Sequence, residues 1–231
     1  MDSINAVRTE NRRDSIHAVH EIAEYWGNVM IQRFVVGAIQ TNCYVFFDEV
    51  SKEAMIVDPG YFEERICTFI EEHQLKPKCI YLTHCHFDHI LGVKELKKRY
   101  EIPVYSSALE EMNLMNDAVN LSTYMSGECV KIPCDKVFFE NDEFEIGATC
   151  FRVLETPGHT AGSSCLYADK ILFSGDTMFC DTYGRCDLPT GNERQIVQSI
   201  KTKLLTLRGD TIVYPGHGEM TTIGEFAELE L

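Results

Sequence analysis

The segment 83–89 places three histidines and one aspartate within six residues. Imidazole nitrogens and carboxylate oxygens are ligands that zinc, iron and manganese use in proteins. The short apolar run before the segment, 79–82, predicts a β-strand. Side chains two residues apart leave a strand on the same face, so His84 and His86 can chelate one ion.

Asp88 and His89 come directly after this strand end. Ile90, Val93 and Leu96 then recur at helical spacing, which predicts a helix. A turn between the strand and the helix can direct Asp88 and His89 toward a second ion beside the first. The pattern H-x-H-x-D-H therefore predicts a metal site.

Three further predicted strands also end at potential metal ligands. These ligands are His159 after strand 150–154, Asp176 after strand 171–173 and His217 after strand 211–214. Each of them lies next to glycine, proline or threonine. If two sheets bring their strand ends to one edge, all seven potential ligands meet there.

The elements that must position these ligands alternate between strands and helices. Further strands are predicted at 31–37, 42–48, 54–57, 103–105, 136–139, 143–146 and 164–167. Helical spacing of apolar residues predicts helices from 62, 90, 109 and 193, the last with Asn192 and Gln195 as a capping box. Two sheets with helices on their outer faces predict an α/β fold, a four-layered sandwich.

Residues 1–29 differ in pattern from the rest of the chain and are predicted to be an N-terminal extension to a domain spanning 30–231. Ile16, Val19, Ala23 and Trp26 fall on one face of a helix, and Gly27 would end it. We therefore expect one amphipathic helix that contributes no metal ligand.

Composition narrows the function classes. The 231 residues include 36 acidic and 21 basic side chains, for a net charge of −15, which repels nucleic acid and anionic membrane surfaces. No apolar run reaches the roughly 18 residues of a membrane span, and no signal peptide opens the chain. The ten cysteines lack any C-x-x-C pair. We expect a cytoplasmic protein with reduced thiols and a small-molecule substrate.

Five motifs carry a family resemblance. They are T-H-C-H-F-D-H from Thr83, T-P-G-H-T-A-G-S from Thr156, F-S-G-D-T-M-F from Phe173, G-R-C-D-L-P from Gly184 and Y-P-G-H-G from Tyr214. In this order they resemble the metallo-β-lactamase fold superfamily, and within it the glyoxalase II-like (hydroxyacylglutathione hydrolase-like) branch. The resemblance covers Met30 to about Gly224 and is far more specific for the site than for the substrate.

The resemblance implies two divalent metal ions, with zinc expected and iron or manganese as alternatives. One ion would be bound by His84, His86 and His159. The second would be bound by Asp88, His89 and His217, with Asp176 bridging the two. It further implies that Asp58, in the V-D-P-G turn, orients a ligand imidazole from behind, although a plain turn aspartate is an equal alternative.

Two metal ions roughly 3.5–4 Å apart lower the pKa of a shared water toward about 7 and supply a hydroxide nucleophile. Asp88 and Asp176 are therefore the candidate catalytic residues. A thiolate leaves without strong protonation, so the expected substrate is an acyl thioester or an activated ester. The expected function is glyoxalase II-like hydrolysis.

The chain also departs from the branch. Residues 179–187 differ from the expected loop sequence, and Cys180 and Cys85 are interpreted as packing residues rather than catalytic thiols. Only fourteen residues follow His217, without lysine or arginine, so we expect poor saturation by the glutathione thioester.

Three alternatives stay open at this point. A mononuclear iron persulfide dioxygenase on the same fold would use His84, His159 and Asp176. A ribonuclease is disfavoured by the negative charge, and a non-enzymatic binding module by the complete set of ligands. The oligomeric state is not predicted.

Overall fold

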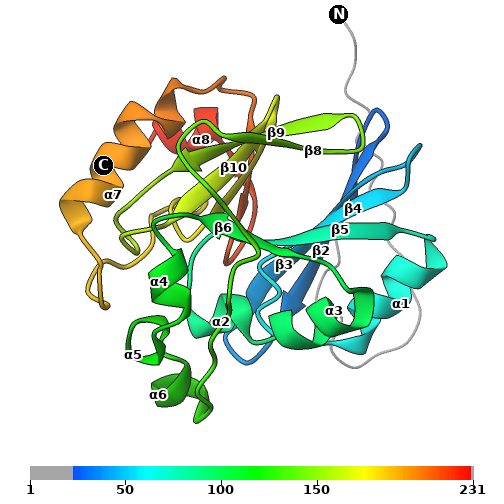
Figure 1. Cartoon of the computed structure of the whole chain (residues 1–231). Helices are drawn as coiled ribbons and strands as arrows, with labels where there is room; N and C mark the ends of the chain where they lie inside the picture. The colour runs from blue at the N-terminus through cyan, green and yellow to red at the C-terminus, as the bar shows by residue number, and fades with distance from the viewer. Residues whose placement is uncertain (1–22, 230–231) are drawn as a thin grey trace, which may run out of the picture.

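Two mixed β-sheets pack face to face, and helices cover the outer face of each (Figure 1). The structure is a computed structural model that describes residues 23–229. The prediction of a four-layered α/β sandwich is confirmed.

The first sheet has seven strands within the described range, in sequence order from β1 to β7. They are β1 (Ala23–Trp26), β2 (Val29–Val36), β3 (Thr41–Asp48), β4 (Glu53–Val57), β5 (Lys76–Leu82), β6 (Val104–Ser107) and β7 (Lys136–Phe138). Pairing is antiparallel from β1 to β4 and parallel from β4 to β7. The parallel half directs the ends of β4 and β5 to the same edge.

The second sheet has six strands among the described residues, in the order β13-β12-β11-β10-β9-β8. They are β8 (Glu143–Ile146), β9 (Thr149–Glu155), β10 (Ser164–Ala168), β11 (Ile171–Gly175), β12 (Ile212–Pro215) and β13 (Thr221–Thr222). Strands β11 and β12 are parallel, so Asp176 and His217, which come after them, emerge at the same edge.

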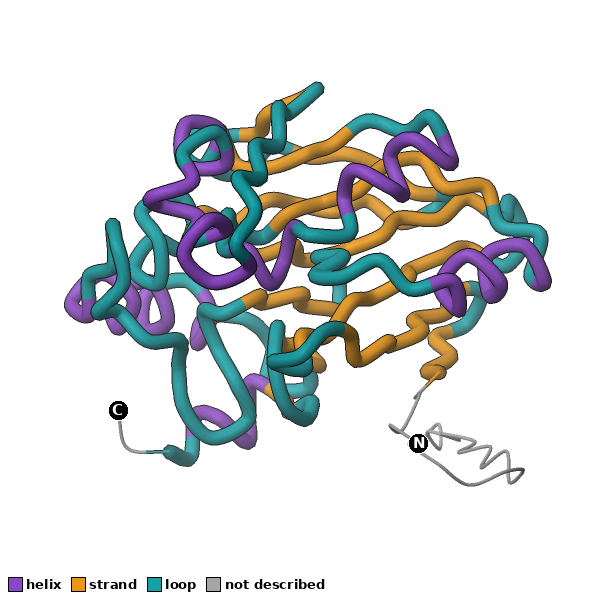
Figure 2. The backbone as a smooth tube through the Cα atoms, turned by 90° about the horizontal axis from the view of Figure 1, so that it is seen from below, coloured by secondary structure: helices purple, strands orange, loops and turns teal. Residues whose placement is uncertain are grey.

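The helices connect the strands and cover the sheets. They are α1 (Glu64–Glu72), α2 (Phe87–Ile90), α3 (Val93–Tyr100), α4 (Glu111–Leu114), α5 (Asp117–Asn120), α6 (Ser122–Ser126), α7 (Glu193–Thr202), the 3-10 helix η1 (Leu204–Thr206) and α8 (Ile223–Ala227). Helix α7 begins where the Asn192 side chain accepts a hydrogen bond from the Gln195 backbone N–H, which is one of the two hydrogen bonds of the predicted capping box. Figure 2 views the molecule from below, with helices in front of the strands.

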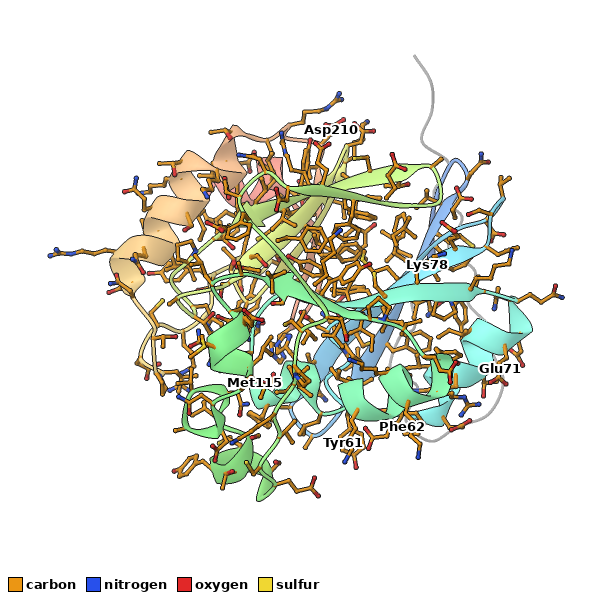
Figure 3. The ribbon with its side chains drawn as sticks, viewed as in Figure 1. Tyr61, Phe62, Glu71, Lys78, Met115 and Asp210 are labelled. Atoms are coloured by element: carbon orange, nitrogen blue, oxygen red, sulfur yellow. The ribbon has the colours of Figure 1, made fainter. Side chains whose placement is uncertain are left out.

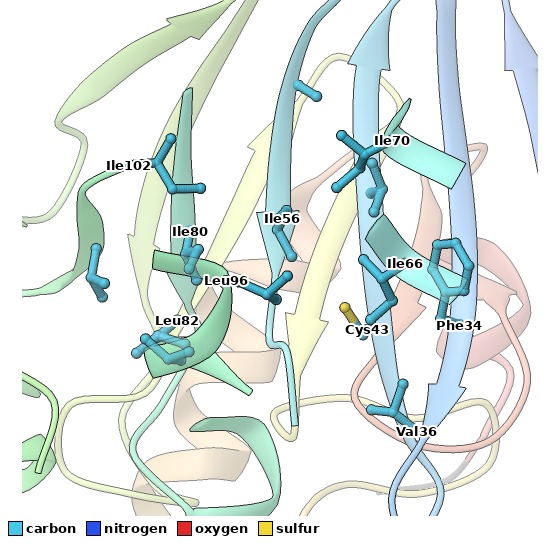
Figure 4. Packing of buried hydrophobic residues seen from close by; sticks show 14 of the residues in the cluster. Phe34, Val36, Cys43, Ile56, Ile66, Ile70, Ile80, Leu82, Leu96 and Ile102 are labelled. Carbon is cyan, nitrogen blue, oxygen red and sulfur yellow. The ribbon is translucent and has the colours of Figure 1, made fainter. Parts of the chain in front are cut away.

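Three layers of apolar side chains hold these elements together. In the first, Ile66 and Ile70 of α1 and Leu96 of α3 pack on the first sheet (Figure 4). The second lies between the sheets, where Figure 3 shows densely packed side chains. It is rich in aromatic rings, such as Phe46 and Phe151, whose centroids are 4.8 Å apart. The third lies between the second sheet and helices α7 and α8.

The predicted N-terminal helix is wrong where the structure describes it. Ala23–Trp26 form strand β1, which pairs with β2 in the register Trp26↔Val29. Gly27 does not end a helix; with Asn28 it makes a two-residue hairpin turn, and its φ of +62° suits glycine at the first turn position. Residues 1–22, the remainder of the predicted extension, lie outside the described residues.

Two further observations concern membrane-spanning helices and the cysteines. Among residues 23–229, no helix combines the length and apolar character that crossing a bilayer requires. All ten cysteines lie in this range, and all of them are free thiols.

Candidate metal centre

The seven predicted ligands all come from loops at strand ends. His84 and His86 come after β5, and His159 comes after β9. The short helix α2 carries Asp88 and His89, while Asp176 and His217 come directly after β11 and β12. The structure therefore brings both sheets' contributions to one edge of the sandwich.

Three imidazoles form the first group, which consists of His84, His86 and His159. His159 Nε2 lies 2.8 Å from His86 Nδ1 and 3.2 Å from His84 Nε2. All three residues are buried. Three nitrogens that converge on one point are a suitable donor set for one divalent ion.

Asp88, His89 and His217 form the second group. Asp88 Oδ2 lies 3.1 Å from His217 Nε2 and 3.3 Å from His89 Nε2. The Asp88 and His89 side chains are buried, whereas 27% of the His217 side chain is exposed. The centre therefore opens to solvent on the side of His217.

Asp176 lies between the two groups. Its Oδ2 is 3.5 Å from His159 Nε2 and 3.7 Å from His217 Nε2, and its Oδ1 is 3.4 Å from His89 Nε2. One carboxylate thus faces nitrogens of both groups. This is the position that a bridging ligand requires.

Metal ions fit these residues. His89 Nε2 and Asp176 Oδ1 are buried and have no hydrogen-bond partner among the described residues. Buried polar atoms are rarely left unpaired, and here both atoms point into the second group. A divalent ion held by the second group would satisfy both atoms. The assignment of the seven residues as ligands stays a prediction.

The electrostatics of the two groups differ. Burial, and after it the neighbouring imidazoles, lower the pKa of His84 well below its usual value and that of His86 to about 3. Burial also disfavours charge on His89, but Asp88, Asp176 and Asp58 outweigh it and raise its pKa well above the usual value. In the absence of an ion, His84 and His86 are therefore neutral, whereas His89 retains a second proton, which an incoming ion would displace.

Asp58 contacts residues of both ligand groups, directly or through Thr83, from outside the proposed centre. Its Oδ2 accepts hydrogen bonds from His89 Nδ1 at 3.0 Å and from Thr83 Oγ1 at 2.6 Å, and its Oδ1 accepts one from the Thr83 backbone N–H at 2.8 Å. The Thr83 hydroxyl is in turn 3.2 Å from His84 Nδ1. Asp58 therefore contacts one histidine of the second group directly and one of the first group through Thr83.

His159 is oriented by the loop after β11. Its Nδ1 lies 2.8 Å from the Arg185 carbonyl oxygen, an acceptor that fixes the proton on Nδ1 and leaves Nε2 free. Gly184 makes this approach possible, because a Cβ there would lie 1.9 Å from the Asp176 carbonyl oxygen and 3.0 Å from His159 Nδ1.

The first sheet also supports the loop that carries His217. The Asn42 side chain donates to the Pro215 and Gly218 carbonyl oxygens at 3.0 and 2.9 Å, and the Tyr44 hydroxyl donates to Pro215 at 2.7 Å. These bonds cross from β3 to the loop after β12. The two halves of the chain are thus joined at the second group.

Several supporting residues had no role in the sequence predictions. Thr41, whose hydroxyl donates to Asp88 Oδ2 at 3.0 Å, lies in an ordinary strand pattern and gave no signal. Thr83 stands inside the quoted metal motif, and that position was the sequence signal that could have identified it as a supporting residue.

Cys85 packs in the core of the first sheet, away from the ligand groups, as strand alternation predicts. Burial and Asp181 raise the pKa of the Cys180 thiol, which keeps it protonated.

Comparison with known proteins identifies relatives along most of the chain. A model of the Metallo-beta-lactamase superfamily matches residues 36–217. The chain is 37% identical to the "Probable metallo-hydrolase YqgX" of Bacillus subtilis, over 83% of this chain and 92% of the relative. It is 33% identical to the "Hydroxyacylglutathione hydrolase GloC" of Haemophilus influenzae, over 84% and 93%.

Solved structures show the same fold. A crystal structure of the BLEG-1 B3 metallo-beta-lactamase superposes with a TM-score of 0.80 at 40% identity, covering 85% of this chain and 95% of that one. TTHA1623 in a di-iron-bound form gives 0.73 at 32% identity, covering 85% and 96%. ETHE1 from Myxococcus xanthus gives 0.70 at 28% identity, covering 86% and 81%.

Proposed function

The chain belongs to the metallo-β-lactamase superfamily, and from this premise we propose that it is a dinuclear metal-dependent hydrolase that cleaves an acyl thioester or activated ester. The single observation that carries the proposal is the position of Asp176. Its carboxylate faces both the three-histidine group and the group of Asp88, His89 and His217. A centre for one ion would need only one of these groups.

When bound, two divalent ions supply Lewis acidity, which lowers the pKa of a water toward about 7 and polarises a substrate carbonyl. The chain's own residues prepare the site for this chemistry. Asp58 Oδ2 accepts the Nδ1 proton of His89, and the Arg185 carbonyl oxygen accepts that of His159, so both Nε2 atoms are free to act as ligands.

Asp88 and Asp176 are the proposed catalytic carboxylates. Each exposes about a tenth of its side chain, so both lie at the floor of the opening beside His217. Interactions with neighbouring histidines overcome the effect of burial and lower the pKa of Asp176 to about 2 and that of Asp88 well below its usual range. Both are therefore ionised at neutral pH and can retain positive charge at the reacting centre.

A thioester suits this site because a thiolate leaves without strong protonation. The name of the Haemophilus relative supports an acyl thioester of this kind, and that of the Bacillus relative supports the broader class of metallo-hydrolases. The proposed substrate is therefore a small acyl thioester or ester rather than a nucleic acid or a membrane component. The ten free cysteines suit a reducing compartment, so we propose that the hydrolase acts in the cytoplasm.

Zinc is the proposed metal, since imidazole and carboxylate donors suit it. Iron is the main alternative, because the neighbour TTHA1623 was solved in a di-iron-bound form. The mononuclear iron dioxygenase considered from the sequence would leave His89 and His217 without a role. The complete second group disfavours it.

The test measures metal content and turnover together. Purified protein, reconstituted separately with zinc, iron or manganese, should bind two ions per chain and hydrolyse lactoylglutathione or a simple acyl thioester. Oxygen consumption with a persulfide substrate is measured in parallel. A firm stoichiometry of one ion, or oxygen consumption without thioester cleavage, would contradict the proposal.

A further inference from the structure

Glu110 is a buried carboxylate between the two loops that carry the first group of ligands. It directly precedes α4 and is fully buried. Its Oε1 accepts hydrogen bonds from the Cys85 backbone N–H at 2.8 Å and from Thr160 Oγ1 at 2.7 Å, and its Oε2 accepts one from Asn113 Nδ2 at 2.8 Å. All three donors are neutral. Burial of a carboxylate among neutral donors is costly, which indicates a role beyond packing.

The residues that Glu110 contacts are next to the ligands of the first group. Cys85 lies between His84 and His86 in the chain, and Thr160 directly follows His159. One carboxylate oxygen therefore fixes the peptide between two ligands and the residue after the third. These loops come from different sheets, β5 and β9, and are 75 residues apart at His84 and His159.

We propose that Glu110 is a positioning residue for the first metal ion. By holding both loops to one oxygen, it keeps the three imidazoles directed at a common point. Glu110 itself does not contact the ion; it acts through the backbone of Cys85 and the hydroxyl of Thr160. The proposal rests on the metal centre proposed above and adds a residue that the ligand pattern does not contain.

The contact between Glu110 and the loop of His159 is unusually close. A Cβ on Gly162 would lie 2.3 Å from Glu110 Oε2 and 2.5 Å from the Glu110 backbone nitrogen, so the approach depends on glycine. The Thr160 hydroxyl is also 2.8 Å from Ser163 Oγ, which fixes its direction. The loop thus presents one specific donor to Glu110.

The second group has supports of its own. Thr41 donates to Asp88, and Asp58 accepts from His89. Loss of Glu110 should therefore weaken the first ion and leave the second nearly unchanged. This selectivity separates a positioning role from a general contribution to folding.

The test compares three substitutions, Glu110→Ala, Glu110→Asp and Glu110→Gln, by competition for Zn²⁺ with a chromophoric chelator and by the visible spectrum of the Co²⁺-loaded protein. Outer partners of metal ligands typically change affinity 10- to 100-fold. We expect a loss of this size at the first ion for Ala. Asp, which keeps the charge but is one methylene shorter, should behave like Ala. Gln has an oxygen at the right reach and should stay within about threefold of the wild type.

Asp48→Ala is the matched control. Asp48 is also a buried carboxylate, and it accepts hydrogen bonds from the backbone N–H groups of Val50 and Ser51. It lies at the far end of β3, however, seven residues from Thr41 and away from the metal centre. Its removal should lower stability without changing the affinity for either ion. The control shows whether loss of any buried carboxylate alters metal binding.

The possible results separate cleanly. Tight binding by the Asp variant with loss in the Gln variant would show that charge matters rather than position, and would overturn the inference. Wild-type binding in all three variants, or equal weakening of both ions, would also overturn it. If the wild-type protein itself binds fewer than two ions, the proposed dinuclear centre fails first.

Discussion

Asp58→Asn should lower the affinity for the second metal ion more than Asp58→Ala does, although Asn keeps the size of the native side chain and Ala removes it. The amide of the Asn variant has only one stable orientation, because the Thr83 backbone N–H, 2.8 Å from Asp58 Oδ1, needs the oxygen there. The NH₂ group must then take the place of Oδ2, which now accepts the Nδ1 proton of His89 at 3.0 Å. Two donors would face each other in a buried site.

The size of the effect can be worked out from these contacts. Binding of an ion through His89 Nε2 requires the proton on Nδ1. In the Asn variant this proton loses its acceptor, at about 0.5–1.5 kcal/mol, and stays buried and unpaired, at about 1–3 kcal/mol. The sum is about 1.5–4.5 kcal/mol, or roughly 10- to 2,000-fold in affinity for the second ion. In the Ala variant the space left by the carboxylate can admit a water that accepts the proton, so the loss should be smaller.

The assay is a competition titration with Zn²⁺ that resolves both binding steps, with Asp48→Asn as the matched carboxylate-to-amide control. We expect the order wild type, Ala, Asn at the second ion, and little change for the control. Stronger binding by the Asn variant than by the Ala variant would show that Asp58 does not act through the His89 proton, and the reasoning would be refuted.

Three further predictions concern other parts of the molecule. Asp176→Ala should lose both ions and most activity, whereas His217→Ala should mainly weaken the second ion; metal analysis after dialysis distinguishes them, and equal losses would contradict the bridging role. Asp48, whose pKa is lowered by the Ser51 backbone N–H, should stabilise the fold above its unfolded-state pKa near 3.8, so the stability gap to Asp48→Asn should close as the pH falls below about 4 in urea titrations. A chain that begins at Ala23 should still bind two ions in metal analysis, because both sheets and all seven proposed ligands follow that residue. If the shortened protein is insoluble, the residues before Ala23 contribute to folding.

The proposed ligands could be selected from the sequence because each has a strong local signal. His159, Asp176 and His217 come after short β-favouring runs and stand beside glycine or proline, a pattern that strands ending at a site produce. The predicted sandwich rested on the same alternation of strands and helices. The local sequence pattern was therefore sufficient to predict the strands and to select the candidate ligands at their ends.

Supporting residues were not predictable in this way. Glu110 is one glutamate in a polar stretch, and only the tertiary fold brings Cys85 and Thr160 to it. At the N-terminus, Ala23 and Trp26 fit helical spacing, but the Gly27–Asn28 pair allows a hairpin, and pairing with β2 satisfies the backbone instead. A contact between distant segments decided the first case, and pairing with the next strand decided the second.

Each ligand group joins parts of the chain that are far apart in sequence. The first group spans His84 to His159, and the second spans Asp88 to His217, which are 129 positions apart in the sequence. Closing such long loops has a large entropy cost, which each bound ion would help to offset. During synthesis the second group stays incomplete until His217 has left the ribosome. The proposed second ion could bind only after that point, so newly made protein should pass through a metal-poor form that is easier to unfold than the mature one.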